Sequence, residues 1–393
     1  MDTITHGIAG ALIGKAVFRG EDLFSSKPMN RARIVTWSLM LGAIFPDSDI
    51  LRDWFSHNQM LILTWHRSFT HSLVCLPIFA LLLAAITRWF ARWRKWDAPS
   101  FAALTGLYAI GILSHIFLDL VTSFGTMIWS PLQWSRPAWD LIFIIDFTFS
   151  ALLLCPQILA WVYRQAEGLK NRAILTWAVL ALASLGVAAL AKNVGAPISA
   201  QSAITIIALL TAFFLLPAFR FKGVSVRYST WNRAGLAAAI IYLAAASYAH
   251  RAALERVGKF AKLYQLQVES LGALPLPPSL WHWDGLLNTP HGVYEVRLDL
   301  SEPAPLASVE HRYYPDALPN QYIEAAKRLP EVQTVLWFSR FPITRFHKEG
   351  SVAIVEIFDA RFSSMRRDRT ASFTYRVKMD EAGQVISKGW VRD

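Results

Sequence analysis

The sequence predicts a mainly α-helical membrane protein, a polytopic bundle of about eight spans followed by a small α+β domain. The chain of 393 residues is 54% hydrophobic and only 17% charged, which is too apolar for an ordinary soluble chain of this length. Its apolar residues form long, nearly uncharged runs within residues 1–250, whereas later residues have mixed polarity. We therefore expect a transmembrane domain over 1–250, a helix with a Pro-rich connector over 251–280, and a soluble α+β domain over 281–393.

Eight nearly uncharged runs are candidates for spanning helices, because a helix needs about 20 residues to cross a hydrocarbon core about 30 Å thick. In chain order they are 4–18, 34–46, 70–87, 101–123, 140–163, 173–191, 203–219 and 234–250. The first run contains Gly7, Gly10 and Gly14, a stripe of small residues that would let another helix approach closely.

Membrane topology explains most of the net charge of +11. Residues 1–250 carry 20 Lys and Arg against 11 Asp and Glu, and residues 251–393 carry 19 against 17. In the first part the basic residues alternate between loops, with 15 in four predicted loops and 4 in the three between them. Since Lys and Arg accumulate on the cytoplasmic side, both termini and the C-terminal domain are expected outside the cytoplasm. No nucleic-acid-binding module is visible, so nucleic acid is not an expected partner.

After residue 250 the pattern of the sequence changes. "LERVGKFAKLYQLQVESLG" has the polar and apolar faces of a helix, and "ALPLPPSL" is typical of a stiff connector. Alternating runs that begin at Gly292, Ser351 and Ser372 predict half-buried strands, and "NQYIEAAKRLPEV" has a helical composition. Cys75 and Cys155 lie inside apolar runs, so neither a disulfide framework nor a cysteine-based zinc site is expected.

Histidines and aspartates gather at the predicted outer ends of the first five spans. They are His6, Asp47 and Asp49 in "FPDSD", His66 and His71 in "WHRSFTHS", His115 and Asp119 in "LSHIFLDLVTSFG", and Asp140 and Asp146 in "WDLIFIID". A polar group beside hydrocarbon must be solvated, paired or bound to a ligand. The convergence of these residues on one leaflet therefore indicates a functional site.

The spacing within these motifs is suited to metal binding. His115 and Asp119 are four residues apart and project from one helix face, with Thr122 extending the stripe. Imidazole nitrogen beside carboxylate oxygen suits Zn²⁺ or Mn²⁺. His66 and His71 are five residues apart, about 140° on a helix, so we expect His66 just before the third span or on its first turn.

Other polar residues of the cluster have other expected roles. Thr70 would cap the third span or support the ligands, and Arg67 would bind a phosphate or carboxylate beside the metal. For Asp140 we expect a helix N-cap. Asp146 is left open between a ligand and a partner that orients ligands. His6 and Asp47 are intermediate between capping or structural residues and ligands.

The motifs "MDTITHGIAGALIG", "GAIFPDSDIL", "WHRSFTHS" and "LSHIFLDLVTSFG", in this order, resemble the YdjM-type family of bacterial inner-membrane, metal-dependent hydrolases. The resemblance covers roughly residues 1–150, and the family is similar in motif logic to the zinc-dependent phospholipase C and P1 nuclease superfamily. It implies a multi-pass protein of the bacterial inner membrane, with Asp49 as a proton acceptor or supporting residue. The metal ligands that it implies are His6, Asp47, His66, His71, His115 and Asp119.

The combined expectation is a membrane-bound metal-dependent hydrolase that acts at the outer leaflet on a phosphoester of a lipid or lipid-linked substrate. A divalent metal, Zn²⁺ by preference, would activate water, and Asp49, or Asp47 if it is not a ligand, would take the proton. The metal and Arg67 would stabilise charge on the phosphate. The sequence contains no serine nucleophile elbow, P-loop or HExxH motif. The alternatives are a transporter or channel in which the same residues bind a passing cation, and a scaffold with a structural metal.

Overall fold

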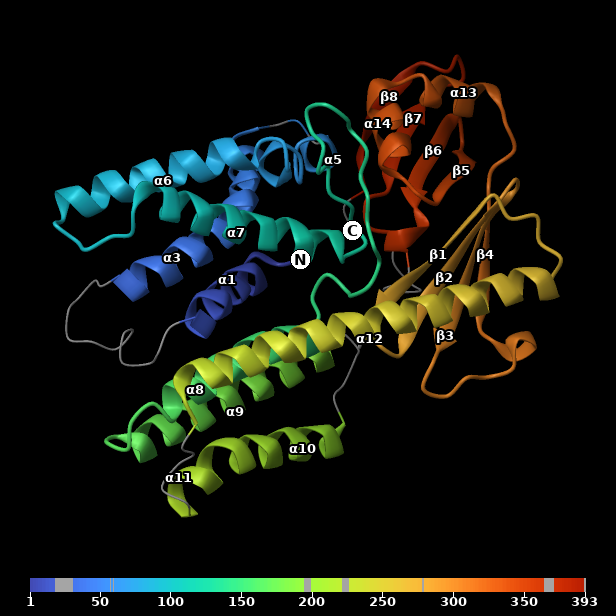
Figure 1. Ribbon diagram of the computed structural model, residues 1–393. Coiled ribbons are helices and arrows are strands. Elements are labelled where there is room, and N and C mark those ends of the chain that lie inside the picture. Colours follow the sequence, from blue (N-terminus) through green and yellow to red (C-terminus); the bar gives the residue numbers. More distant parts are fainter. Residues whose placement is uncertain are drawn as a thin grey trace.

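The computed structural model describes a mostly helical N-terminal part followed by a C-terminal part with two β-sheets (Figure 1). This arrangement confirms the coarse division predicted from polarity. The described residues are 1–17, 31–56, 58, 60–193, 199–220, 226–277, 279–363 and 371–391.

Each of the eight predicted runs overlaps a helix. The principal helices of this part are α1 (Thr3–Val17), α3 (Arg31–Ile44), α6 (Leu76–Trp93), α7 (Phe101–Leu120), α8 (Phe147–Val162), α9 (Leu169–Asn193), α10 (Ala200–Leu210), α11 (Leu216–Arg220) and α12 (Tyr228–Leu263). By length and composition, five helical segments of the described chain could cross a membrane: Arg31–Arg52, Leu76–Trp93, Phe101–Leu120, Gln201–Arg220 and Tyr228–Leu263. The structure therefore supports several candidate spans, and the number of eight stays a prediction.

Two helices begin later than their apolar runs. The third run starts at residue 70, but α6 begins at Leu76 with Pro77 in its first turn, because proline fits there and interrupts a helix elsewhere. The fifth run starts at residue 140, but α8 begins at Phe147, where the Asp146 carboxylate accepts a hydrogen bond from the Phe149 amide at 2.9 Å. Polar residues expected within spans consequently lie in irregular segments before helices.

Short irregular helices fill these segments. They are η1 (Phe45–Asp49), α4 (Ile50–Phe55), α5 (Leu61–Thr64) and η2 (Phe69–His71). η1 is a 3₁₀ helix of five residues that contains Pro46 in its first turn and directly continues α3. The segment from α5 to η2 then leads to α6. Three of the six predicted metal ligands, Asp47, His66 and His71, thus lie on these connections.

Three helices of the N-terminal part pack at very close range. A Cβ atom added to Gly10 of α1 would lie 2.6 Å from the carbonyl oxygen of Leu39, and one added to Gly111 of α7 would lie 2.7 Å from the same atom. Only glycine permits this approach from two sides of α3. The predicted role of the small-residue stripe is confirmed, and the packing draws the first turn of α1, the end of α3 and the end of α7 together.

The C-terminal part contains two four-stranded antiparallel sheets, ordered β1-β2-β3-β4 and β5-β6-β7-β8. The strands of the first are β1 (Ser270–Leu276), β2 (His282–Thr289), β3 (Gly292–Asp299) and β4 (His311–Pro315). Those of the second are β5 (Pro342–Glu349), β6 (Val352–Asp359), β7 (Tyr375–Met379) and β8 (Val385–Trp390). The expected strands match β3, β6 and β7, and the expected helix forms α13 (Gln321–Lys327) and α14 (Pro330–Phe338).

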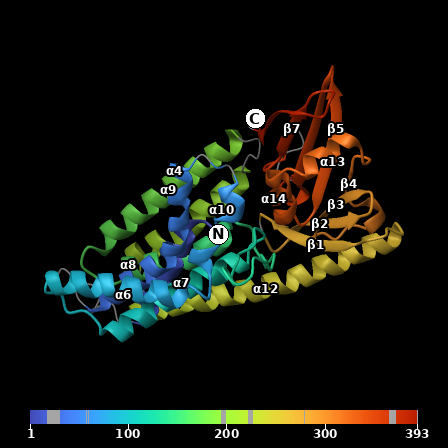
Figure 2. The same ribbon diagram turned by 90° about the horizontal axis from the view of Figure 1, so that it is seen from above.

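α12 joins the two parts of the molecule. Its 36 residues continue through position 250, so the last predicted span and the amphipathic helix after it form one element. Near its end, Val257 and Phe260 share a core with Trp283 and Val296 of the first sheet. The segment expected as a stiff connector instead contributes to β1, which pairs with β2. Figure 2 shows α12 running alongside both parts.

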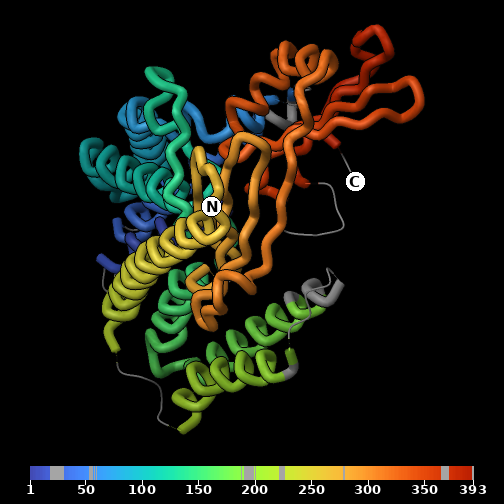
Figure 3. The backbone as a smooth tube through the Cα atoms, turned by 90° about the vertical axis from the view of Figure 1, so that its right-hand side faces the viewer, coloured from blue at the N-terminus to red at the C-terminus, as the bar shows by residue number. Residues whose placement is uncertain are grey.

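The second sheet packs against the connections at the end of the helical bundle. Leu63 and Phe124 share a core cluster with Val335 of α14 and Val355 of β6. In Figure 3 the orange and red strands of this part gather beside the helices. The Arg340 guanidinium binds both carboxylate oxygens of Asp140 at 2.9 Å. Asp140 is thus a docking residue, and the expectation of an N-cap is wrong because Asp146 caps α8.

We predict that Gly111→Val destabilises the protein much more than Gly106→Val. The added side chain at Gly111 meets the α3 backbone, whereas a Cβ at Gly106 on the same helix meets nothing within 4 Å. Overpacking of this kind costs about 1–3 kcal/mol, and the two variants share the same change in helix propensity. Thermal unfolding in detergent measures the difference. Equal unfolding midpoints would contradict the close-packing argument.

Candidate metal centre

Four segments of the N-terminal part bring three imidazoles and two carboxylates together in a cluster, which we call the buried cluster. Its members are His6 on α1, Asp47 on η1, His71 on η2, and His115 and Asp119 on α7. The three histidines and Asp119 have no exposed surface, and Asp47 is 9% exposed. The structure therefore brings together five of the six ligands predicted from the sequence.

The orientation of His115 is fixed by the backbone of α3. Its Nδ1 lies 2.6 Å from the carbonyl oxygen of Ala43, an atom that can only accept a hydrogen bond. Nδ1 therefore carries the ring proton, and Nε2 presents its lone pair to the cluster. This arrangement depends on the close approach of α3 and α7 at Gly111.

His71 presents its Nε2 to the same place. Its Nδ1 lies 3.0 Å from Thr70 Oγ1 and 3.5 Å from a carboxylate oxygen of Asp49. Its Nε2 lies 2.9 Å from Nε2 of His115. A carboxylate that holds the outer nitrogen of a metal-binding histidine fixes the ring orientation and makes the inner nitrogen more basic.

Two facing lone pairs need a positive charge between or beside them. Nε2 of His115 lies 3.5 Å from Asp47 Oδ1 and 3.4 Å from Asp119 Oδ2, so carboxylates increase this need. Burial acts to lower the pKa of His71, but the Asp119 and Asp47 carboxylates outweigh it and raise that pKa above its ordinary value. The electrostatics of the cluster thus favour a bound cation, either a proton or a metal ion.

The donor atoms fit a divalent metal. Both ring nitrogens of His6 and Asp119 Oδ2 are buried and form no hydrogen bond with the described residues. His6 stacks on His115 with ring centroids 3.6 Å apart and places Nε2 3.3 Å from Asp119 Oδ1. Buried polar atoms without a hydrogen-bond partner are costly unless a ligand satisfies them.

The cluster contains two overlapping groups of three possible ligands. One is His6, His115 and Asp119, and the other is Asp47, His71 and His115; within each, the ligand atoms lie within 4.8 Å of one another. Because Nδ1 of His115 faces Ala43, only its Nε2 is available, and both groups share that atom. An ion held there could take further ligands from either group. Imidazole and carboxylate donors of this number suit Zn²⁺ or Mn²⁺.

Asp47 and Asp49 lie on opposite sides of His71. In a 3₁₀ helix with three residues per turn, positions two apart face different directions. Asp47 Oδ1 lies 3.6 Å from the inner nitrogen of His71, and Asp49 Oδ2 lies 3.5 Å from the outer one. The sequence motif "FPDSD" therefore supplies one carboxylate to the buried cluster and one that supports it.

His66 is the predicted ligand that the structure leaves outside both groups. Its side chain is 18% exposed, and Nδ1 lies 3.0 Å from Asp49 Oδ1. His66 was expected just before the third span or on its first turn, but α6 begins ten residues later, at Leu76. Thr70 does not cap that helix; its hydroxyl donates to Asp49 Oδ2 at 3.3 Å and so has the supporting role that was expected as the alternative.

Arg67 faces the buried cluster, as its predicted role requires. The side chain is 2% exposed, with Nη2 2.9 Å from Asp119 Oδ1 and Nη1 donating to Thr122 Oγ1 at 3.1 Å. Its backbone has a φ of 60°, and its amide donates to Asp49 Oδ2 at 3.0 Å. Arg67 thus supports the cluster carboxylate Asp119 through its side chain and the neighbouring carboxylate Asp49 through its backbone.

Three contributors were not predicted from the sequence. The Thr3 hydroxyl donates to Asp47 Oδ2, and the Met1 amino group donates to Asp119 Oδ1, both at 2.5 Å. The guanidinium carbons of Arg136 and Arg67 each lie 5.1 Å from the centroid of the Phe124 ring. Burial and the charges of Arg67 and Arg361 lower the pKa of Arg136 to about 9. The signal for Thr3 was present in "MDTITHG", three residues before His6, but its partner is 44 residues away.

Asp146 belongs to neither ligand group. Its carboxylate caps α8 and accepts a hydrogen bond from the Tyr242 hydroxyl at 2.8 Å, which joins α8 to α12. Among the described residues Asp146 thus has a structural role, instead of either of the two expected roles of metal ligand and ligand-orienting partner.

The first 195 residues match the model of a family described as YdjM inner membrane protein. The match includes all four motifs that carried the resemblance and extends beyond them, through α8 and α9. Comparisons with curated proteins and with solved structures gave no match. The family and the five apolar helical segments together identify a membrane protein.

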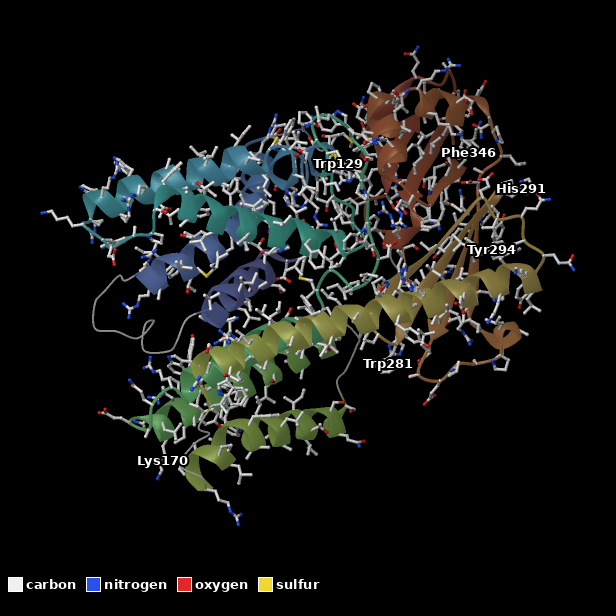
Figure 4. All side chains as sticks on the ribbon, viewed as in Figure 1. Trp129, Lys170, Trp281, His291, Tyr294 and Phe346 are labelled. Atoms are coloured by element: carbon white, nitrogen blue, oxygen red, sulfur yellow. The ribbon has the colours of Figure 1, made fainter. Side chains whose placement is uncertain are left out.

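We predict that His115→Ala removes bound metal, because His115 Nε2 is common to both ligand groups. Asp49→Asn should keep the metal stoichiometry but weaken affinity about 10–100-fold, the usual effect of losing a residue that orients a ligand. The control is His291→Ala, since His291 is exposed and distant in the second part of the chain (Figure 4). Elemental analysis and zinc titration of the purified proteins measure both effects. Full metal content in His115→Ala would rule out the site.

Proposed function

We propose, from the membership of residues 1–195 in the YdjM inner membrane protein family, that this chain is a membrane-bound metal-dependent hydrolase. Its substrate is a phosphoester of a lipid or lipid-linked molecule. The observation that carries the proposal is the 2.9 Å approach of the His71 and His115 Nε2 atoms between the Asp47 and Asp119 carboxylates. A buried nitrogen and oxygen donor set of this kind fits Zn²⁺, the metal we propose.

When bound, the metal would act as a Lewis acid on a phosphoryl oxygen and lower the pKa of water towards neutrality. His6, Asp47, His71, His115 and Asp119 would hold it. Ala43 and Asp49 fix the two imidazoles from behind, at 2.6 Å from His115 Nδ1 and 3.5 Å from His71 Nδ1. The chain's contribution is thus a site in which the ligand orientations are set before substrate binds.

His66 and Asp49 are the proposed proton-transfer pair. Both oxygens of Asp49 are engaged, one near His66 Nδ1 and the other with the Arg67 amide, so Asp49 acts by positioning. His66 is partly exposed, and its Nδ1 contact leaves Nε2 to take a proton from the attacking water. This assigns the proton acceptor to His66 and retains Asp49 as its partner.

Arg67 is proposed to position Asp119 and to add positive charge beside the phosphate. Its two terminal nitrogens are engaged by Asp119 and Thr122. A guanidinium has five N–H donors, and its buried Nε forms no hydrogen bond with the described residues, so donors remain for a substrate oxygen that enters the cluster. A guanidinium that is already held in place needs little reorganisation when charge develops on a phosphate.

Hydrolysis is favoured over transport by the course of α1. A cation pathway should continue as polar groups towards the far side of the membrane. Between His6 and Lys15, however, α1 carries only Gly, Ala, Leu and Ile. Lys15 at the far end donates to the Gln157 side chain at 2.8 Å. The polar groups at the two ends of α1 are therefore separated by an apolar segment.

We predict that the purified protein with Zn²⁺ hydrolyses phospholipids and soluble phosphodiesters, and that His115→Ala abolishes both activities. His66→Gln should lower kcat about 10²–10⁴-fold, the usual contribution of proton transfer, without loss of metal. His291→Ala serves as the control. Release of phosphate products and metal content are measured on the same samples. Unchanged turnover by metal-free protein would contradict the mechanism. Tight metal binding without turnover would favour the alternative in which the protein is a scaffold with a structural metal.

The C-terminal part is proposed to lie outside the cytoplasm, at the same end of the bundle as the buried cluster. In a variant with Cys75→Ser and Cys155→Ser, Leu318→Cys should react with a membrane-impermeant maleimide added to intact cells. Leu318 is 83% exposed in the C-terminal part. Glu167→Cys, exposed between α8 and α9, should react only after lysis. The reverse pattern would invert the topology.

A further inference from the structure

An apolar groove opens on the side of the helical part between the end of α3, α4, α6 and α7. It encloses about 510 Å³, within the usual range of ligand sites. Its walls are mainly apolar and include Leu41 of α3, Ile50 and Leu51 of α4, and Leu83 and Ile86 of α6.

One end of the groove reaches the buried cluster. Thr3 and Asp47 line it there, and the Thr3 hydroxyl donates to Asp47 Oδ2 at 2.5 Å. The other carboxylate oxygen of Asp47 lies 3.5 Å from His115 Nε2. A molecule in the groove would therefore touch the same carboxylate that contributes to the candidate metal centre.

Two hydroxyl groups that satisfy each other line the groove farther from the buried cluster. Thr87 Oγ1 of α6 and Tyr108 OH of α7 lie 2.6 Å apart, and both residues line the groove. Tyr108 precedes His115 by seven residues on α7, which places it about 10 Å along the helix axis. The groove thus runs from the buried cluster along the bundle, with polar groups at its ends and an apolar middle.

The rim of the groove faces the surface where lipid would lie. Leu41, Ile50, Leu51 and Ile86 are each 37–51% exposed. They belong to Arg31–Arg52 and Leu76–Trp93, two of the segments that are long and apolar enough to cross a membrane. A groove open in this direction could receive a hydrocarbon chain sideways from the bilayer, without passage of that chain through water.

We infer that this groove holds one acyl chain of the lipid whose phosphoester lies at the buried cluster. The inference rests on the proposed function, since the phosphoester defines which end of the lipid meets Asp47. Lipid tails are already in an apolar medium, so the groove selects by shape and length rather than by hydrophobicity. Leu83 and Ile86 are then determinants of chain length.

The test fills the groove at Leu83 and compares a matched position on the same helix. Leu83→Trp places an indole in the groove, whereas Leu82→Trp makes the same change at a residue that is 52% exposed and does not line it. The probe for binding is a phosphatidylglycerol with a photoreactive acyl chain, mapped by mass spectrometry of the crosslinked peptides. The probes for turnover are short-chain and long-chain phosphatidylglycerol and the soluble bis-p-nitrophenyl phosphate.

We expect crosslinks at the Leu83–Thr87 segment in the wild type and in Leu82→Trp, and their loss in Leu83→Trp. The ratio of short-chain to long-chain hydrolysis should rise about tenfold or more in Leu83→Trp alone, which is the low end for a changed fit in an apolar pocket. Hydrolysis of the soluble diester should be the same in all three proteins, because it needs no groove.

The results separate the two proposals. Equal crosslinking and equal chain-length ratios in the two tryptophan variants, with zinc-dependent hydrolysis intact, would overturn the acyl-chain site and leave the hydrolase standing. Crosslinks that Leu83→Trp removes, without hydrolysis of any ester, would overturn the proposal that the protein is a hydrolase. The acyl chain in the groove would then not belong to a substrate. Loss of soluble-diester hydrolysis in Leu83→Trp alone would show damage to the cluster, and Leu83→Phe, a smaller filling change, then decides by its chain-length ratio.

Discussion

The approach of two imidazole nitrogens within a shell of buried carboxylates is the constraint on which the N-terminal part depends. Nε2 of His71 and Nε2 of His115 are 2.9 Å apart, with carboxylate oxygens of Asp47 and Asp119 at 3.2–3.6 Å from them. Removing a charged group from water costs several kcal/mol unless it is paired and hydrogen-bonded. The positively charged and hydrogen-bonding groups around the cluster pair with its carboxylates. Arg67 and the Met1 amino group contact Asp119 Oδ1, which leaves Oδ2 directed at the imidazoles.

Two of the ligands, Asp47 and His71, lie on short 3₁₀ segments between the long helices, and this irregular backbone requires protection by the rest of the protein. Non-helical backbone near a bilayer is tolerated only where protein or water satisfies its polar groups. The second sheet supplies part of that cover, because Leu63 and Phe124 belong to the same core as Val335 and Val355. Arg136 adds hydrogen bonds to the Leu63 and Gly125 carbonyl oxygens at 2.7 and 3.1 Å. The segments that carry ligands are thereby held from the side of the C-terminal part.

Sequence reasoning succeeded where a pattern is local and failed where a contact is distant. His115 and Asp119 share a helix face because of their spacing alone, and Gly10 allows close packing because it lacks a side chain. The expected start of the third span near residue 70 was wrong, since the helix begins at Leu76 with Pro77 in its first turn and leaves both His66 and His71 in an irregular segment before it. The pairing of Asp140 with Arg340 joins residues 200 positions apart, and no periodicity reports such a contact. The continuation of α12 past residue 250 was missed because a fall in hydropathy was taken as the end of an element, although the helix continues into a new apolar contact with Trp283.

Phe124 shows why the candidate centre and the C-terminal part should be considered together. The Phe124 ring contacts the Arg67 guanidinium, which binds the cluster carboxylate Asp119. The same ring lies 5.2 Å from the ring of Phe338 on α14. Arg361 continues this connection by donating to the carbonyl oxygen of Ser123, the residue before Phe124, while its Nε binds Asp359. These contacts are short, buried and shared, so a displacement of the second sheet would change the surroundings of Phe124 and Arg67 at once. The C-terminal part contributes no ligand to the described cluster, yet it completes the packing that holds Arg67 against Asp119.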